Sequence, residues 1–165
     1  MITLVRPRLL QINRFLEEEN VQNLKQVCLL GAYVKRRVNL ALICDQKTVV
    51  PVDELTHCIR ESLTYLTQYG AVCTLHQDGR GDVNSRDVQT AYDFFEDCLE
   101  TALPTLSALM VRVECGGRFS VRLMLEDAAG LPHADKYRAL GKLTIDDAGG
   151  ALCATFSPDR GGERA

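Results

Sequence analysis

Four carboxylates crowd one side of a helical pattern around the segment FFEDCLETALP at residues 94–104. They are Asp93, Glu96, Asp97 and Glu100, here called the acidic face. Like charges three and four residues apart on a helix repel by roughly a few tenths of a kcal/mol each. The acidic face is therefore either solvated or holds a cation, and carboxylates suit both Mg²⁺ ligation and general-base chemistry.

No other motif with an established chemistry is complete in the sequence. His57, His76 and His133 have no Cys or Ser partner at a motif spacing, which is typical of surface or strand-end histidines. The phosphate-binding patterns G-x-x-x-x-G-K-[ST] and G-x-G-x-x-G are absent, as is a nucleophile elbow. The seven cysteines are odd in number and include no C-x-x-C pair. This count argues against a disulfide framework or a zinc site, and it favours the cytoplasm.

Bulk composition disfavours two classes of partner. The 165 residues carry a net charge of −3 and are 46% hydrophobic. This weakly acidic balance disfavours nonspecific nucleic-acid binding, which needs a basic surface. No apolar run approaches the roughly 18 residues that span a bilayer, and the N-terminus lacks the pattern of a signal peptide. We expect no membrane segment in this chain.

The N-terminal quarter predicts two helices. Residues 7–18 carry an apolar stripe, and Pro7 suits a first helical turn. Residues 20–43 form a longer pattern, which Asn20 is placed to cap. Its apolar residues recur every three or four positions, as in a helix–helix seam: Val21, Leu24, Cys28, Gly31, Val34, Val38 and Ala41. These helices predict a hairpin that either packs within the monomer or dimerises, and the sequence leaves both alternatives open.

A basic cluster, Tyr33-Val34-Lys35-Arg36-Arg37, lies on the longer of these helices. Its lysine and arginines either form a solvated face or bind the carboxylates of a partner. The sequence does not decide between these two interpretations.

Residues 45–52 break the helical pattern, and we place a domain boundary there. Asp53 is predicted to cap a third helix, with Gly70 after its end. A strand follows in AVCTLHQ, and then a loop in DGRGDVN. Asn84 or Ser85 is predicted to cap the fourth helix, which carries the acidic face.

The C-terminal part predicts two β-hairpins. ALMVRVEC and RFSVRLMLED flank Gly116-Gly117, while KLTID and ALCATFS flank DAGG. A loop with room for one helical turn separates them. This order predicts a two-layer α/β sandwich, with a mixed sheet that has its helices on one face, preceded by the helical hairpin. The expected units are the hairpin at 1–48, the α/β domain at 49–158 and a disordered tail at 159–165.

From residue 53 to 158 the chain resembles the ATP-binding domain of sensor histidine kinases, within the GHKL superfamily. The fourth helix then takes the place of that family's Mg²⁺-binding helix, whose pattern resembles v-L-x-N-L-L-x-N-A. One alignment puts Asp97 and Thr101 at the two asparagine positions, where they would contact the Mg-nucleotide. A second subgroup has E-x-x-x-N-A, which makes Glu96 the base and puts Glu100 at the metal-binding asparagine. Neither alignment recovers an asparagine.

The glycine-rich segments of that family are kept in part. Its D-x-G-x-G, whose Asp reads adenine, falls on EDAAG, so Glu126 or Asp127 is the implied adenine reader and Gly130 the last glycine. About ten residues precede Gly141 where the ATP lid is expected, and they lack the G-x-G whose backbone amides would hold phosphates. The end of the domain matches better, with Gly141, Gly149 and Gly150 in place.

The N-terminal region also resembles these kinases, because GAYVKRRVNLALI is similar to the second helix of a dimerising hairpin in one subgroup. Residues 1–43 contain no histidine, so the chain begins downstream of the phospho-accepting motif or never had it. The resemblance implies transfer of the γ-phosphoryl group of ATP to a histidine, with ATP and Mg²⁺ as cofactors. It also implies a homodimer through residues 7–43 and a response regulator or upstream sensor region as partner. The alternative is a pseudokinase-like regulatory or dimeric interaction module that binds no ATP.

Overall fold

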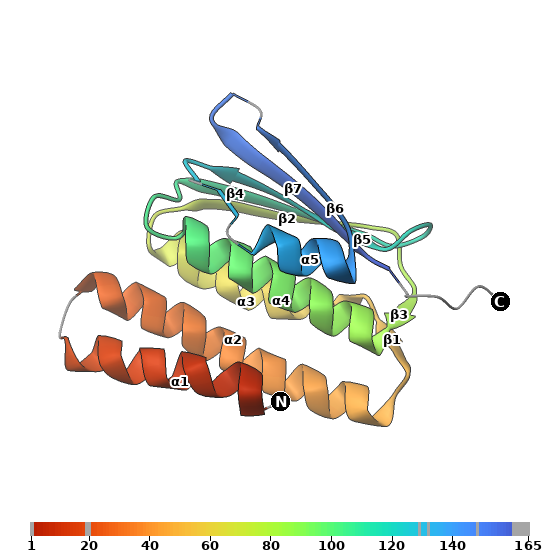
Figure 1. The fold of residues 1–165 in the computed structure, drawn as a ribbon, viewed down its shortest axis with the longest axis horizontal. Helices are drawn as coiled ribbons and strands as arrows, with labels where there is room; N and C mark the ends of the chain where they lie inside the picture. Colours follow the sequence, from red (N-terminus) through yellow and green to blue (C-terminus); the bar gives the residue numbers. More distant parts are fainter. Residues whose placement is uncertain (1, 19–20, 129, 132, 148, 160–165) are drawn as a thin grey trace.

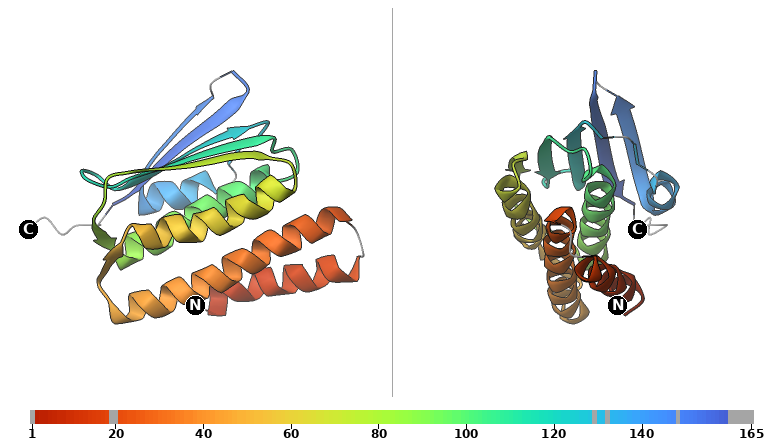
Figure 2. Two further views of the ribbon diagram at one scale, coloured as in Figure 1. Left: turned by 180° about the vertical axis from the view of Figure 1, so that it is seen from behind. Right: turned by 90° about the vertical axis from the view of Figure 1, so that its left-hand side faces the viewer.

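A computed structural model describes residues 2–18, 21–128, 130–131, 133–147 and 149–159. They form a sheet, a layer of helices that covers one face of it, and the N-terminal hairpin packed beneath those helices (Figures 1 and 2). The predicted fold class is confirmed: the sheet is mixed, its helices lie on one face, and a helical hairpin precedes it.

The hairpin consists of α1 (Ile2–Glu17) and α2 (Val21–Gln46). Because α1 already begins at Ile2, Pro7 lies inside the helix instead of in its first turn. The predicted cap Asn20 lies outside the described residues. The buried stripe of α2 differs from the predicted seam, since Leu24 is half exposed. The buried side chains are Leu29, Leu30, Ala32, Tyr33, Arg37, Leu40 and Ala41.

Two short strands, β1 (Val49–Pro51) and β3 (Asp82–Asn84), pair antiparallel in a separate small sheet. They lie in segments that were predicted as a domain boundary and a loop, so the sequence prediction missed them. Three-residue strands that contain Pro and turn residues are too short for an alternating pattern. The small sheet ties the end of the hairpin to the start of the fourth helix.

Helices α3 (Asp53–Gln68) and α4 (Ser85–Ala102) form most of the layer under the sheet (Figure 2). The predicted cap of α3 is wrong, because Val52 is the N-cap and makes no side-chain hydrogen bond. The predicted cap of α4 is confirmed, since the Asn84 side chain accepts a hydrogen bond from the backbone N–H of Arg86 at 2.9 Å. A polar N-cap satisfies one of the free N–H groups of the first turn.

The main sheet has the strand order β2-β4-β5-β7-β6. Its strands are β2 (Val72–Asp78), β4 (Ala108–Glu114), β5 (Ser120–Glu126), β6 (Gly141–Asp147) and β7 (Ala151–Pro158). β2 and β4 are parallel, and β3 and α4 connect them in the chain. The other neighbouring strands are antiparallel. Both predicted β-hairpins are therefore confirmed. The loop between them contains a further helix, α5 (Ala134–Leu140).

The core lies between the sheet and α4, with Val111, Leu123 and Phe156 against Phe94 and Phe95. On its other side α4 meets the hairpin (Figure 1). Because α4 is covered from both sides, its acidic face does not lie open to solvent.

The last described residue of the chain is Asp159. The predicted disordered tail lies outside the described residues apart from Asp159, whose backbone N–H donates to the carbonyl of Leu140 at 3.1 Å. Among the described helices, none is both long and apolar enough to cross a bilayer.

Candidate functional site

Asp97 receives three hydrogen bonds from two different elements. Arg8 of α1 and Lys136 of α5 each donate at 2.8 Å, and the Tyr137 hydroxyl donates at 2.5 Å. Burial acts to raise the pKa of Asp97, but the hydrogen bonds from Lys136 and Tyr137 and the nearby positive charges outweigh it, so that this pKa is lowered. Asp97 is therefore an ionised carboxylate that the chain's own cations neutralise.

Asp93 is bound in the same way by α2. The Tyr33 hydroxyl donates to Oδ1 at 2.9 Å, and the Arg37 guanidinium reaches both carboxylate oxygens, at 2.7 and 3.2 Å. Arg37 also donates to Gln89 at 2.7 Å. A guanidinium that bonds both oxygens of one carboxylate is among the stronger ion pairs in proteins. The hairpin thus presents two arginines, Arg8 and Arg37, to the acidic face.

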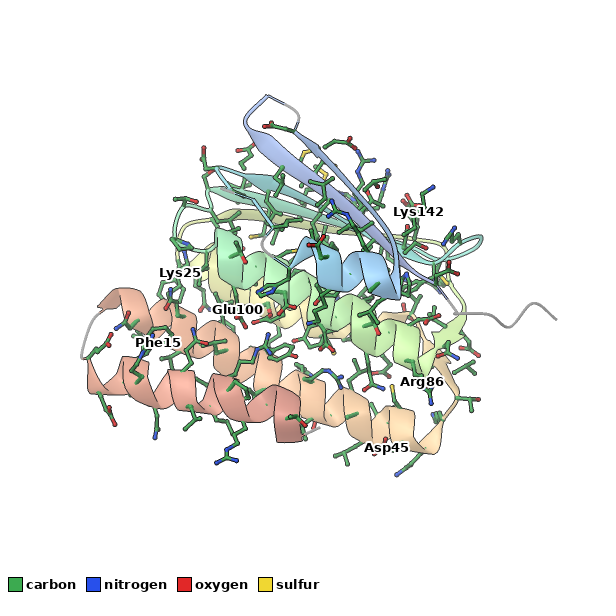
Figure 3. The ribbon with its side chains drawn as sticks, viewed as in Figure 1. Phe15, Lys25, Asp45, Arg86, Glu100 and Lys142 are labelled. Atoms are coloured by element: carbon green, nitrogen blue, oxygen red, sulfur yellow. The ribbon has the colours of Figure 1, made fainter. Side chains whose placement is uncertain are left out.

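Glu100 and Thr101 are the residues that the kinase resemblance puts at the metal position. Glu100 lies on the side of α4 that faces the hairpin (Figure 3), where it accepts from Arg8 Nε at 3.0 Å. Burial raises its pKa more than Arg8 lowers it. The Thr101 hydroxyl donates to the backbone carbonyl of Asp97 at 2.9 Å. Both side chains therefore have partners within the protein.

Glu96, which the resemblance makes the base, is the one fully buried carboxyl of the acidic face. Its exposed fraction is 0%, and neither of its carboxyl oxygens has a hydrogen-bond partner among the described residues. Burial, reinforced by the negative charges of Glu100 and Asp97, raises the pKa of Glu96 well above its usual range. The neutral acid is therefore the favoured form in this structure.

Tyr137 fills the space between α4 and α5, beside Asp97. It is 2% exposed and packs edge-on against Phe94 and Phe156, at centroid distances of 5.0 and 5.3 Å. The cavity that remains between α4, α5 and β6 has a volume of about 10 Å³. Ligand sites usually have volumes of roughly 300–1,000 Å³. In this conformation the cleft is too small for a nucleotide.

The two implied adenine readers point elsewhere. Glu126 follows the buried Leu125 along β5, so strand alternation places Glu126 on the open face of the sheet, away from α4. Asp127 has a positive φ of 61° and accepts a hydrogen bond from the Ser107 hydroxyl at 2.7 Å. Gly130 has a φ of 129°, a conformation that only glycine adopts without strain. Glu126 therefore lies on the face of the sheet opposite α4, while the predicted roles of Asp127 and Gly130 stay predictions.

Gly141 is required by the sheet itself. A Cβ at this position would lie 2.3 Å from the backbone oxygen of Ser157, on the paired strand β7. The close pairing of the two strands therefore explains this glycine without a nucleotide.

The other predicted groups also bind within the chain or lie on its surface. Lys35 donates to Glu61 of α3 at 2.6 Å, and Arg36 bonds the same carboxylate. The basic cluster thus contacts carboxylates of this chain, an arrangement that neither sequence interpretation included. All three histidines are exposed, and the seven cysteines are free thiols. Within the described part of the chain, no three His, Cys, Asp or Glu side chains are arranged to hold a metal ion.

Mg²⁺ and ATP do not fit the residues that are present here. The carboxylates of Asp93, Asp97 and Glu100 are bound by arginine, lysine and tyrosine, while Glu96 favours its neutral form, which is a poor metal ligand. A helix, α5, takes the place of the loop whose amides would hold phosphates.

Sequence reasoning missed the residues that cover the acidic face: Arg8, Lys136 and Tyr137. Arg8 is 89 residues away from Asp97, and no local pattern relates them. A signal for α5 was present, since Leu131, Ala134 and Tyr137 recur every three residues.

Two solved structures share the fold of this chain. One described as a bacterial phosphotransferase matches with a TM-score of 0.57 and 11% identity, over 92% of this chain and 88% of its own. The histidine kinase domain of a blue-light activated histidine kinase from Erythrobacter litoralis matches with a TM-score of 0.52 and 14% identity, over 94% and 95%. No family model and no curated relative matches the sequence. The chain has the fold of histidine kinase catalytic domains, and the match includes the hairpin.

Proposed function

We propose that this chain is a degenerate histidine-kinase-type signalling module, which acts through protein contacts and does not turn over ATP. One observation carries the proposal: the chain's own side chains occupy the helix face and the cleft that a Mg-nucleotide would need. Asp97 binds Arg8, Lys136 and Tyr137, and the cavity beside it has a volume of about 10 Å³.

Charge supports this proposal. Phosphoryl transfer depends mainly on positioning and on Mg²⁺ that neutralises the developing charge. Here the cations are built into the protein, because Arg8 and Arg37 come from the hairpin and Lys136 from α5. A Mg²⁺ ion would have to displace one ion pair to reach Asp93 or Glu100, and two to reach Asp97.

A titration with ATP and Mg²⁺ tests the proposal. We expect no saturable heat in isothermal calorimetry up to millimolar ATP, with or without Mg²⁺, because binding would break the contacts of Asp97 and expel Tyr137. The same titration with ADP tests whether the protein binds a nucleotide that lacks the γ-phosphate. A Mg²⁺-dependent dissociation constant in the micromolar range would contradict the proposal.

That contrary result would favour the second candidate function, which is phosphoryl transfer from ATP to a histidine of another protein. The observation in its favour is that hairpin and α/β domain together match nearly the whole length of a histidine kinase domain. Residues 1–43 contain no histidine, so the acceptor would lie outside the hairpin. A response regulator or a sensor protein is the partner class for either candidate.

We also propose that the chain forms a homodimer through the hairpin. Leu9, Leu16 and Leu24 are between 50 and 56% exposed on α1 and α2, although each is a large apolar side chain. Val34 of the predicted seam packs against the core and is not available for such a contact. Apolar side chains gathered on one exposed surface often mark a protein interface.

Light scattering coupled to size-exclusion chromatography measures the mass of the protein in solution and so tests this dimer. We expect a mass of twice the chain for the native protein and of one chain for the double variant Leu9→Glu/Leu16→Glu, because two buried carboxylates would oppose association. Leu140→Glu is the control, since Leu140 is 44% exposed on α5, away from the hairpin. A native monomer, or a double variant that stays dimeric, would exclude this interface.

A further inference from the structure

The joint between the hairpin and α4 encloses a carboxyl group without a partner. Glu96 is fully buried, and a cavity of about 40 Å³ borders it between α1, α2 and α4. Gln11 and Gln26 of the hairpin line this cavity together with Leu29, Leu30, Leu99 and Leu103. Neither oxygen of Glu96 accepts or donates a hydrogen bond within the described chain.

Such an arrangement is costly for a charged group. An ionised carboxylate that loses its water needs a cation and several hydrogen bonds to compensate. Arg8 is the cation of the hairpin that favours the ionised form of Glu96, but its guanidinium is already bonded to Asp97 and Glu100. The hairpin therefore closes over Glu96 more easily when that carboxyl is neutral.

The surrounding groups reinforce this preference. The titratable and charged groups around Glu96 and its neighbour Tyr92 are Arg8 from α1, Tyr33 from α2, Cys58 from α3, and Asp93, Asp97 and Glu100 from α4. Arg8 favours ionisation of Glu96, while the three carboxylates oppose it. Burial acts in the same direction as the carboxylates and is the largest effect on the pKa of Glu96.

We propose that the joint between the hairpin and α4 is a proton-linked latch, closed by Arg8 while Glu96 is neutral and loosened when Glu96 ionises. The linkage follows from the two states. In the open state water reaches Glu96, which then has the pKa of an ordinary glutamate, whereas closure raises that pKa. Closure therefore takes up a proton, and rising pH favours the open state. This inference concerns the joint alone and does not depend on the absence of ATP binding.

The side chains of α1 are consistent with a contact that can open. Among those that the structure describes, Val5 is the buried one, while Leu9, Leu10 and Leu16 are at least half exposed. Arg8 holds α1 to α4 through two carboxylates and lies over the ring of Tyr33 at 4.7 Å. Segments with few buried apolar contacts open locally at low free energy.

Hydrogen exchange of the native protein between pH 5 and 8 tests the latch. We expect the protection of hairpin peptides to fall with rising pH. This protection is corrected for intrinsic exchange and compared with the protection of peptides from β4 and β5. Hairpin protection should fall by at most about tenfold per pH unit in the range where Glu96 titrates, because one proton is released on opening. Glu96→Gln and the apolar Glu96→Leu both remove the carboxyl of Glu96, and each should reduce this pH dependence to the part that Glu100 contributes, because burial raises the pKa of Glu100 as well.

Two control variants separate the latch from general loosening. Glu17→Gln removes an exposed carboxyl from the same hairpin and should keep the native pH dependence. Arg8→Ala should reduce hairpin protection at every pH, whereas Arg14→Ala, an exposed arginine on the same helix, should not. The inference is overturned if Glu96→Leu retains the native slope, or if native hairpin protection rises with pH because Glu96 captures Arg8.

Discussion

Replacing Asp97 by alanine is expected to lower the free energy of unfolding by about 3 kcal/mol. The substitution removes the acceptor shared by Arg8, Lys136 and the buried hydroxyl of Tyr137. Removing one partner of a buried pair costs more than the pair contributes, because the hydroxyl of Tyr137 and the guanidinium of Arg8 lose an acceptor while they remain largely buried. Urea denaturation followed by circular dichroism measures the loss.

Two variants calibrate this result. Asp135→Ala removes a carboxylate that is 98% exposed and pairs with Arg138 at 2.9 Å, so its effect should stay within about 0.5 kcal/mol. Asp97→Asn keeps an oxygen for Tyr137 but loses the charge, so its loss of unfolding free energy should lie between those of Asp97→Ala and Asp135→Ala. An Asp97→Ala protein as stable as Asp135→Ala would mean that this network does not hold the hairpin and α5 to α4.

The pH dependence of the same variants has a definite sign. The pKa of Asp97 is lowered in the folded protein from an ordinary value of 3.8. Its stabilising contribution is therefore complete above that value and is lost as the pH falls through the lowered pKa. The native protein should exceed Asp97→Asn in stability at pH 6, and the difference should shrink below pH 3.8.

The local elements of this fold were largely predictable from sequence. The strands around Gly116-Gly117 alternate and end at a glycine pair, so their hairpin was predicted. Asn84 was predicted as a cap because its side chain suits the first turn of α4. Short-range rules failed for β1 and β3, whose three residues each are held by pairing with a distant segment.

What covers the acidic face was not predictable in the same way. The alternatives from sequence were a solvated face or one that holds a cation, and the cations are Arg8, Arg37 and Lys136, which lie far from α4 in the chain. Periodicity shows that a helix has a charged face, but it carries no information on which distant element packs there. The kinase resemblance located the right helix, whereas only the packing showed that its carboxylates already have partners.

Replacing Tyr137 by alanine is expected to cost about 4 kcal/mol of unfolding free energy, because a buried aromatic ring is removed from a packed core. The ring contacts Phe94 and Phe156, and its hydroxyl donates to Asp97. Tyr137→Phe keeps the ring and removes the hydroxyl alone, so it should cost about 1–2 kcal/mol. Thermal or urea unfolding of both variants separates packing from the hydrogen bond.

Tyr137→Ala also decides whether α5 plugs a working nucleotide site. The variant enlarges the cleft beside Asp97, which is about 10 Å³ in the native protein. If a nucleotide site lay intact behind the ring, the variant would bind ATP with Mg²⁺ while Tyr137→Phe would not. We expect neither to bind, because Arg8 and Lys136 still neutralise Asp97 and Glu126 still lies on the far face of the sheet. Saturable Mg²⁺-dependent binding by Tyr137→Ala would instead mean that α5 is a removable plug over a kinase-type site.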